Sequence, residues 1–181
     1  TLLVLNLHVP ASEAISHSHS LLKELINLVP NLISYLLSFL TLGIFWVGQQ
    51  TQFNQFVRSD RHLTWIHLGF LLAVSLMPFS TALLAAFITS RTALVVYWFN
   101  IFLLGVLLFA SWRYAEHKSL IQDEMTAAHR SATERRILIA QGLYALGAAL
   151  CVINTFVSIA AIVLVQLNYA IAPRIRFLDR L

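Results

Sequence analysis

The sequence predicts an all-α membrane protein with six transmembrane helices in each subunit. Of its 181 residues, 59% are hydrophobic and only 11% are charged, and the mean hydropathy is +0.76. Soluble domains carry about a quarter charged residues, so this much apolar surface requires lipid around it. Apolar runs of membrane-spanning length alternate with short polar turns, and Trp and Tyr residues flank them, as is typical of a bilayer interface.

The chain opens on an apolar run, residues 1–9. This run rises roughly 13 Å as a helix, less than half of a ~30 Å hydrocarbon core, so we expect it to be the outer half of a first helix that begins upstream. On a helix, one face of the run carries Leu2, Leu5, Asn6 and Val9, with Thr1 beside Leu5. Considered alone, this face is either a helix-packing surface or the wall of a pore.

Five complete spans are expected after a polar linker, residues 11–20, and an amphipathic stretch, residues 21–28. Their expected ranges are Val29 to about Gln50, Leu63 to about Ser90, Ala93–Trp112, Ile137 to about Ile153, and Phe156–Ala172.

Polar residues within the spans need hydrogen-bond partners. Pro78 frees a backbone carbonyl one turn earlier, and Ser75, Ser80 and Thr81 are within reach of it. His67 is either a hydrogen-bonded packing residue or a proton sensor. Hydrogen bonds between helices are the expected role of the amides of Gln49, Gln50, Asn100, Asn154, Gln166 and Asn168.

One long polar segment, residues 113–136, is expected to form a cytoplasmic helical connection between the fourth and fifth spans, within a single transmembrane domain over residues 1–181. Ten of the twelve Lys and Arg residues fall on one side when this segment, the turn at Asp60 and the C-terminal tail are placed together. Only Lys23 and Arg91 are left on the other side. Positive charge marks the cytoplasmic side, so both termini are expected there.

The sequence does not favour an enzyme, because it has no Gly-rich phosphate loop, paired-cysteine motif or nucleophile elbow. The net charge of +4 lies in loops between apolar runs, so a nucleic-acid surface is not expected. His8, His17 and His19 have only Glu13 nearby as a further ligand, so neither a metal nor another cofactor is expected.

Several blocks resemble one family in their order along the chain. They are Thr1-Leu-Leu-Val-Leu5 with the following Asn-Leu-His-Val-Pro10, Phe45-Trp46 followed by Phe53, Asp60-Arg-His-Leu-Thr-Trp-Ile-His-Leu68, Met77-Pro-Phe-Ser-Thr-Ala-Leu-Leu84, and Tyr97 followed by Asn100. Over essentially its whole length the sequence is similar to the transmembrane protein 175 family of potassium channels. The family's Phe-Ser-Asp motif would lie upstream of Thr1, and Gln49 and Gln50 stand where many relatives carry a histidine pair.

This resemblance implies a homotetramer of six-helix subunits in a bacterial plasma membrane, with the first helices around a central pore. Matched by position, Leu2 and Leu5 would form a hydrophobic constriction, and Thr1 would form a layer that modestly favours potassium over sodium. Asn6 and Val9 would continue the pore lining. The implied partners are further copies of the chain, the lipid bilayer and permeant monovalent cations, with no cofactor.

Without the resemblance, the sequence is also compatible with two other functions. A proton-coupled or other secondary transporter would keep ionisable groups or repeated broken helices in the membrane, and the complete spans hold only His67. A non-conducting membrane scaffold would use the leucine face for packing alone.

Overall fold

A computed structural model describes residues 29–122 and 127–171 of the chain. This part contains five α-helices, a 3-10 turn and no strand, which confirms the all-α fold class. The helices are α3 (Val29–Phe53), α4 (Arg61–Ala86), α5 (Arg91–His117), α6 (Ala127–Ala149) and α7 (Thr155–Ile171), and the 3-10 turn η2 is Leu150–Val152. Three helical segments are long and apolar enough to cross a membrane, namely α4, α5 and Arg130–Val152, and α7 is apolar but shorter.

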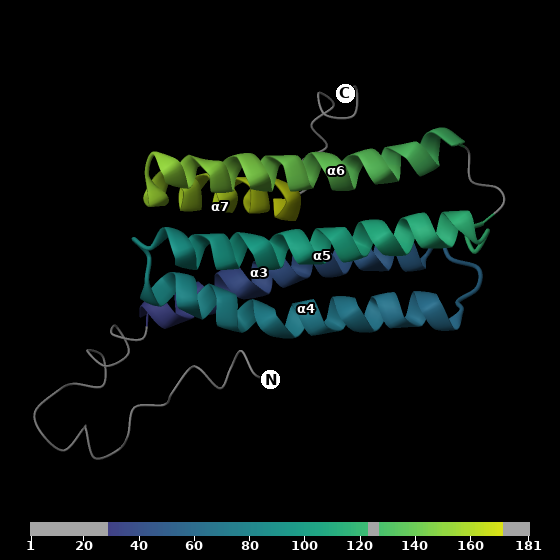
Figure 1. The fold of residues 1–181 in the computed structure, drawn as a ribbon, viewed down its shortest axis with the longest axis horizontal. Helices are drawn as coiled ribbons and strands as arrows, with labels where there is room; N and C mark the ends of the chain where they lie inside the picture. The colour runs from purple at the N-terminus through teal and green to yellow at the C-terminus, as the bar shows by residue number, and fades with distance from the viewer. Residues whose placement is uncertain (1–28, 123–126, 172–181) are drawn as a thin grey trace, which may run out of the picture.

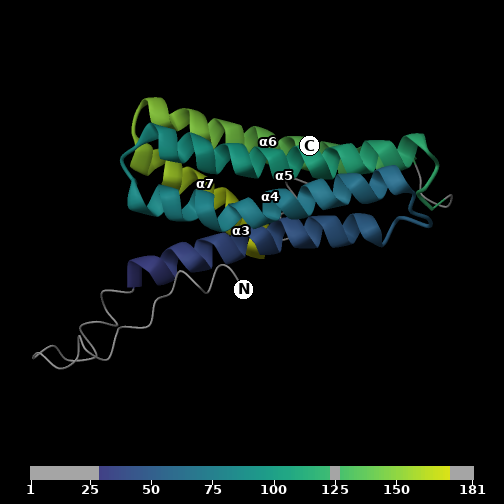
Figure 2. The same cartoon turned by 60° about the horizontal axis from the view of Figure 1, so that its bottom comes forward.

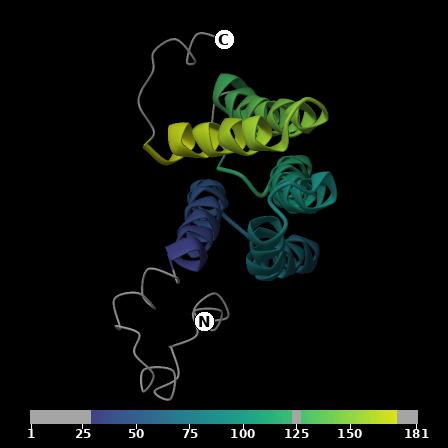
Figure 3. The same cartoon turned by 90° about the vertical axis from the view of Figure 1, so that its left-hand side faces the viewer.

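The helices lie side by side, with α5 between the pair α6 and α7 and the pair α3 and α4 (Figure 1). Turning the molecule brings α3 forward along the outer side of α4 and α5 (Figure 2). In the view from one end, α3, α4 and α5 are seen nearly along their axes, whereas α7 crosses above them at a steep inclination (Figure 3). Because α5 has neighbours on both sides, it is the central helix of the bundle.

Helices α4 and α5 form a tight hairpin whose ends are set by polar caps. The Asp60 carboxylate accepts a hydrogen bond from Leu63 N at 2.8 Å and so caps α4. At the opposite end the chain turns at Phe87, whose N–H donates to the Leu83 carbonyl, and Ser90 then caps α5. Each cap satisfies a backbone N–H that the first helical turn leaves without a partner.

The main core lies between α4 and α5 and extends to α6 and α7. Its fully buried side chains include Phe70 and Met77 of α4, Leu94 and Ile101 of α5, and Ile162 of α7. The faces that point away from this core carry exposed apolar side chains on every helix. A bundle that is apolar inside and outside is what a lipid solvent allows, and it agrees with an integral membrane protein.

A second apolar cluster closes the end of the bundle where α3 and α5 finish. Trp112 is fully buried there, and Phe56 packs against it with ring centroids 6.3 Å apart. A short antiparallel bridge pairs Phe56 with Ile121, in which Val57 N donates to the Leu120 carbonyl at 2.8 Å. The loops after α3 and α5 are thereby joined directly.

Helices α6 and α7 form the second hairpin. The Ser158 hydroxyl donates to the Gly147 carbonyl at 2.6 Å, close to where α6 passes into η2. Gly147 itself allows close approach, because a Cβ there would lie 3.1 Å from Ile162 Cγ1. A small residue and a hydroxyl group therefore hold the two helices together, as expected for helices within a membrane.

Several helix ends differ from those predicted. Helix α3 continues past the predicted end at about Gln50 to Phe53. The amides in its last turns lie inside the bundle, where Gln52 bonds to the Leu108 carbonyl of α5, so they do not mark the end of the helix. Helix α4 begins at its Asp60 cap and ends at Ala86, before the predicted end at about Ser90. Helix α5 extends to His117, and α6 begins at Ala127, so both ends of the polar segment 113–136 are helical and the fifth span starts earlier than predicted.

Candidate functional site

The predicted pore-forming residues, Thr1, Leu2, Leu5, Asn6 and Val9, lie outside the described residues. So do the three N-terminal histidines, His8, His17 and His19. Their roles therefore stay predictions. What the structure describes is the helical bundle to which this segment is joined, including the polar contacts that fix the bundle's shape.

A buried polar junction joins α3, α5 and α7. The Gln166 Nε2 donates to Thr41 Oγ1 and to Tyr97 Oη, both at 2.8 Å. Thr41 Oγ1 in turn donates to the Leu37 carbonyl at 2.8 Å and lies 3.3 Å from Tyr97 Oη. All three side chains are buried, so these hydrogen bonds replace water and set the positions of three helices relative to one another.

A second group of amides joins α3 to α4 and α5 nearer the other end. Gln52 Nε2 donates to the Leu108 carbonyl at 3.1 Å, and Gln52 Oε1 accepts from Ser111 Oγ at 2.7 Å. Gln49 Nε2 lies 3.3 Å from His67 Nδ1, and the His67 ring also contacts Phe53, with ring centroids 4.5 Å apart. His67 is thus in contact with an amide and an aromatic ring, which agrees with the packing alternative.

Asn100 of α5 supports α4 beside Pro78. In the amide orientation that satisfies both of its ends, Asn100 accepts from Met77 N at 3.0 Å and donates to the Ala73 carbonyl at 3.1 Å. A regular α-helix would join these two backbone groups to each other. Pro78 itself frees the carbonyl of Val74, and its predicted partners bond elsewhere. Ser75 donates to the Leu72 carbonyl, Thr81 donates to the Met77 carbonyl, and Ser80 Oγ donates to Asn100 in this amide orientation.

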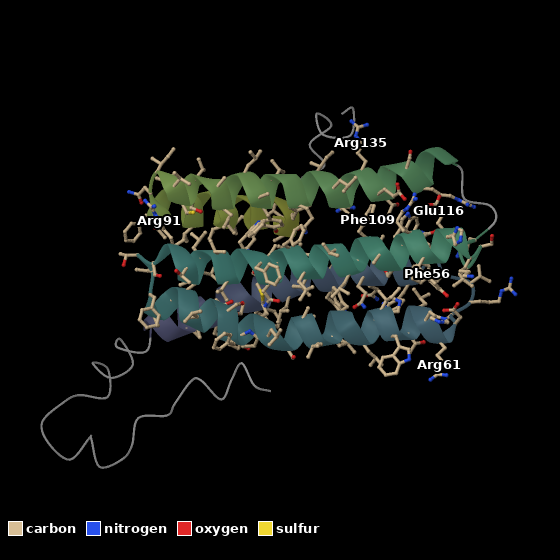
Figure 4. All side chains as sticks on the ribbon, viewed as in Figure 1. Phe56, Arg61, Arg91, Phe109, Glu116 and Arg135 are labelled. Carbon is tan, nitrogen blue, oxygen red and sulfur yellow. The ribbon has the colours of Figure 1, made fainter. Side chains whose placement is uncertain are left out.

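The charged side chains gather at one end of the bundle, where Arg61 and Glu116 lie opposite Arg91 at the other end (Figure 4). Here the Asp60 carboxylate also accepts a hydrogen bond from Tyr114 Oη at 2.6 Å. Together with the Leu63 N–H, which contributes most, this bond holds the pKa of Asp60 below its usual value. Arg113 pairs with Glu134 at 3.0 Å and so joins the ends of α5 and α6.

The polar groups inside the described bundle are mainly hydroxyl and amide groups. The described carboxylates, those of Asp60, Glu116 and Glu134, lie at its charged end. No group of three metal-ligating side chains occurs within residues 29–122 and 127–171. Among the amides predicted to join helices, Gln49, Asn100 and Gln166 do so. Asn154 instead caps α7 by accepting from Phe156 N at 2.8 Å.

Sequence reasoning missed the role of Gln52 and the hydroxyl groups that bond to Gln52 and Gln166. Thr41, Tyr97 and Ser111 are each buried and each bond to a glutamine at least 59 residues away. Their signal in the sequence is a single polar group on a helix face that is otherwise apolar.

Comparisons with known proteins identify the family that the chain resembles. Residues 1–78 match the family model of the endosomal/lysosomal potassium channel TMEM175. The chain is TMEM175-like. A potassium channel of Chamaesiphon minutus is 27% identical over 176 residues, which cover 94% of this chain and 86% of that protein. A potassium channel of Streptomyces collinus is 28% identical over 174 residues, which cover 93% and 83%.

A solved structure matches the fold of this TMEM175-like chain. It is the crystal structure of a lysosomal potassium-selective channel TMEM175 homolog from Chamaesiphon minutus, with a TM-score of 0.76 and 24% identity. The match covers 94% of this chain and 88% of the other, so the bundle is shared over nearly its whole length. The predicted resemblance is confirmed, and the matched family is one of potassium channels, not of enzymes.

Proposed function

We propose that this chain is the subunit of a homotetrameric potassium channel whose pore is lined by the helix that includes residues 1–9. The observation that carries the proposal is the match of residues 1–78 to a potassium channel family model, because that match includes the predicted pore-lining run. The whole-length similarity to two proteins named potassium channels supports it.

Dehydration provides the mechanism for the constriction. Leucine side chains from four subunits, Leu2 and Leu5 in each, would narrow the water path until water leaves it, so an ion meets a desolvation barrier there. Potassium sheds its water more easily than sodium, and a ring of Thr1 hydroxyls would partly replace the lost shell. Asn6 and Val9 would continue the wall. Selectivity is therefore expected to be modest, since no cage of carbonyl groups is proposed.

The described bundle suits the role of a rigid support for such a helix. The buried side chains of Thr41, Gln52, Tyr97, Ser111 and Gln166 are hydrogen-bonded between helices, and the charged residues of the bundle gather at one end. Apolar side chains of α3, such as Phe39 and Trp46, are exposed and offer a surface to lipid or to neighbouring helices. A proton-coupled transporter is expected to hold carboxylates inside its membrane-spanning bundle. The described carboxylates of Asp60, Glu116 and Glu134 lie instead at the charged end.

The charge distribution supports an orientation with both termini in the cytoplasm of a bacterium and with segment 113–136 on that side. Attachment of a membrane-impermeant thiol reagent to single cysteines tests it in intact cells. In a background in which Cys151→Ser removes the native thiol, Ser119→Cys is expected to react only after the membrane is permeabilised, and Thr92→Cys is expected to react in intact cells. The reverse pattern would overturn the orientation.

Single-channel recording of the purified protein in planar bilayers tests the pore assignment. Leu2→Ala and Leu5→Ala are expected to raise the leak current, because a smaller side chain lets water remain in the constriction. Thr1→Val is expected to lower the potassium to sodium permeability ratio. The matched control is Leu72→Ala on α4, whose side chain is 65% exposed on the outside of the bundle and should leave both quantities unchanged.

The same preparation separates the alternatives. Unaltered conductance and selectivity in all three pore variants would reject the pore assignment. A saturable, electroneutral flux would identify a transporter instead. No potassium flux from liposomes without valinomycin would identify a scaffold.

A further inference from the structure

A small hollow opens at the end of the bundle opposite the charged cluster. It has a volume of about 270 Å³ and lies between the turn that joins α4 to α5 and the turn that joins η2 to α7. Its polar lining comes from Thr89, Arg91, Asn154 and Thr155, and Cys151, Ile153 and Phe156 complete it. Two turns that are about 60 residues apart in the sequence thus form one concave surface.

Arg91 reaches across this hollow from one turn to the other. Its Nη2 donates to the Val152 carbonyl at 3.2 Å, which uses one of the five N–H donors of the guanidinium group. Among the described residues, the carboxylates of Glu116 and Glu134 are engaged with Arg113, and Asp60 caps α4, all at the far end (Figure 4). The charge of Arg91 therefore has no carboxylate partner in the described part of the chain.

The backbone adds to the positive potential of the hollow. Both α5 and α7 begin here, at Arg91 and Thr155, so the positive ends of two helix dipoles lie at the site. Asn154 uses its Oδ1 to cap α7, which leaves its Nδ2 as a donor. The Thr155 hydroxyl donates to the Thr89 carbonyl at 3.4 Å. The guanidinium group of Arg91, the amide of Asn154 and the Thr89 hydroxyl remain as donors, and this set suits a phosphate oxygen.

The rim of the hollow is apolar. Val152 is 71% exposed, Ile153 is 80% exposed and Phe156 is 55% exposed. A volume of about 270 Å³ is at the small end for a ligand site, so it would hold only the head of a larger molecule. A ligand with a phosphate head and apolar chains fits both the donors and the rim.

We propose that this hollow binds the phosphate group of a membrane phospholipid, with the Arg91 guanidinium as its principal contact. The site follows from insertion of the bundle in a membrane and does not depend on ion conduction. The phosphate oxygens accept hydrogen bonds from Arg91 and Asn154, and the acyl chains lie along Val152 and Ile153. Free inorganic phosphate offers the same oxygens without the chains, so the test distinguishes the two sources.

Cys151 provides a local readout, because it lines the hollow and is the one cysteine in the sequence. The rate at which a small maleimide labels Cys151 is measured on the delipidated, detergent-solubilised protein. The probes are short-chain phosphatidylglycerol, the matching diacylglycerol without a phosphate, and inorganic phosphate. Native mass spectrometry of the same samples gives the number of bound lipids and their affinity independently of the thiol.

The phospholipid is expected to slow labelling of wild-type Cys151, and its affinity is expected to fall about tenfold or more in Arg91→Gln, because a charge-assisted bond is lost. Arg91→Lys should fall between the two, since it keeps the charge without the planar fork. The control is Arg61→Gln, an exposed arginine at the far end, which should bind like the wild type. The melting temperature of each variant checks that it is folded.

Equal protection by inorganic phosphate would assign the site to the free ion. Equal protection by the diacylglycerol would overturn the proposal, and so would unchanged phospholipid binding in a folded Arg91→Gln variant. None of these results depends on whether potassium passes through the protein, so the lipid site and the proposed channel fail separately.

Discussion

Gly105, in the middle of α5, is the described glycine at which an added Cβ would meet a neighbouring side chain at the shortest range. A Cβ built on Gly105 would overlap Nε2 and Cδ of Gln141 on α6. Both atoms would lie far inside van der Waals contact, so Gln141 would have to leave its place. By contrast, a Cβ on Gly142 meets no atom within 4 Å. Gly105→Ala should therefore be less favourable than Gly142→Ala.

The size of the effect follows from two opposing contributions. Overpacking of a well-filled interior costs about 1–3 kcal/mol, and the cost here should lie at the low end of that range, because the atoms in the way are the end of the flexible Gln141 side chain. Replacement of a helical glycine by alanine stabilises the helix by about 1 kcal/mol. Gly105→Ala alone thus combines both, whereas Gly105→Ala in a Gln141→Ala background keeps only the favourable part, because the obstructing side chain is gone. The coupling between the two substitutions is expected to lie at the low end of about 1–3 kcal/mol.

Thermal unfolding of the four proteins of this double-mutant cycle, in one detergent, measures the coupling. For a chain of this size each kcal/mol shifts the melting temperature by about 2–4 °C. Gly142→Ala is the control and should melt at or slightly above the wild-type temperature. A coupling below about 0.5 kcal/mol would refute the reasoning, because substitutions at positions that do not touch are additive within that margin.

Two further predictions concern polar groups. Asn100→Leu should destabilise the protein by about 1–3 kcal/mol, because it leaves the backbone beside Pro78 without its amide partner, whereas Phe99→Leu on the exposed side of the same helix should change the unfolding free energy by less than about 0.5 kcal/mol in denaturation curves. An equal loss in both variants would contradict the role of the amide. The folded state lowers the pKa of Asp60, so its carboxylate contributes stability that is present above about pH 4, the unfolded value, and is lost as the pH falls through the folded pKa. Melting temperatures recorded from pH 7 to pH 3 should therefore show the wild type losing its advantage over Asp60→Asn at the acid end, with a smaller pH dependence in Tyr114→Phe. A constant difference between wild type and Asp60→Asn over this range would show that the cap does not titrate.

The spans were predictable because each is an apolar run longer than the polar turns around it. The end of α3 was not, because the amides of Gln49 and Gln52 look like the polar end of a span. Their partners, His67 on α4 and Ser111 on α5, come later in the chain, and no local pattern in the sequence joins them. Tertiary hydrogen bonds thus extended a helix whose local composition indicated a stop.

The support of Pro78 shows the same limit. The sequence predicted that a hydroxyl group on the same helix would bond to the carbonyl freed by Pro78, but Ser75, Ser80 and Thr81 bond to other groups. The structure instead places Asn100 of α5 on the neighbouring backbone groups, Met77 N and the Ala73 carbonyl, and this contact depends on how two helices face each other. For the pore residues Thr1, Leu2 and Leu5, the sequence remains the source of the prediction, since the described part of the chain begins at Val29.

The hairpin of α6 and α7 has a consequence for how the protein is made. The described part of α7 has 17 residues, whereas Arg130–Val152, which includes most of α6, is long and apolar enough to cross a membrane. The Ser158 hydroxyl bonded to the Gly147 carbonyl and the close approach at Gly147 hold α7 against α6. Because α7 is the last helix of the described chain, this contact can form only after the ribosome has finished both helices.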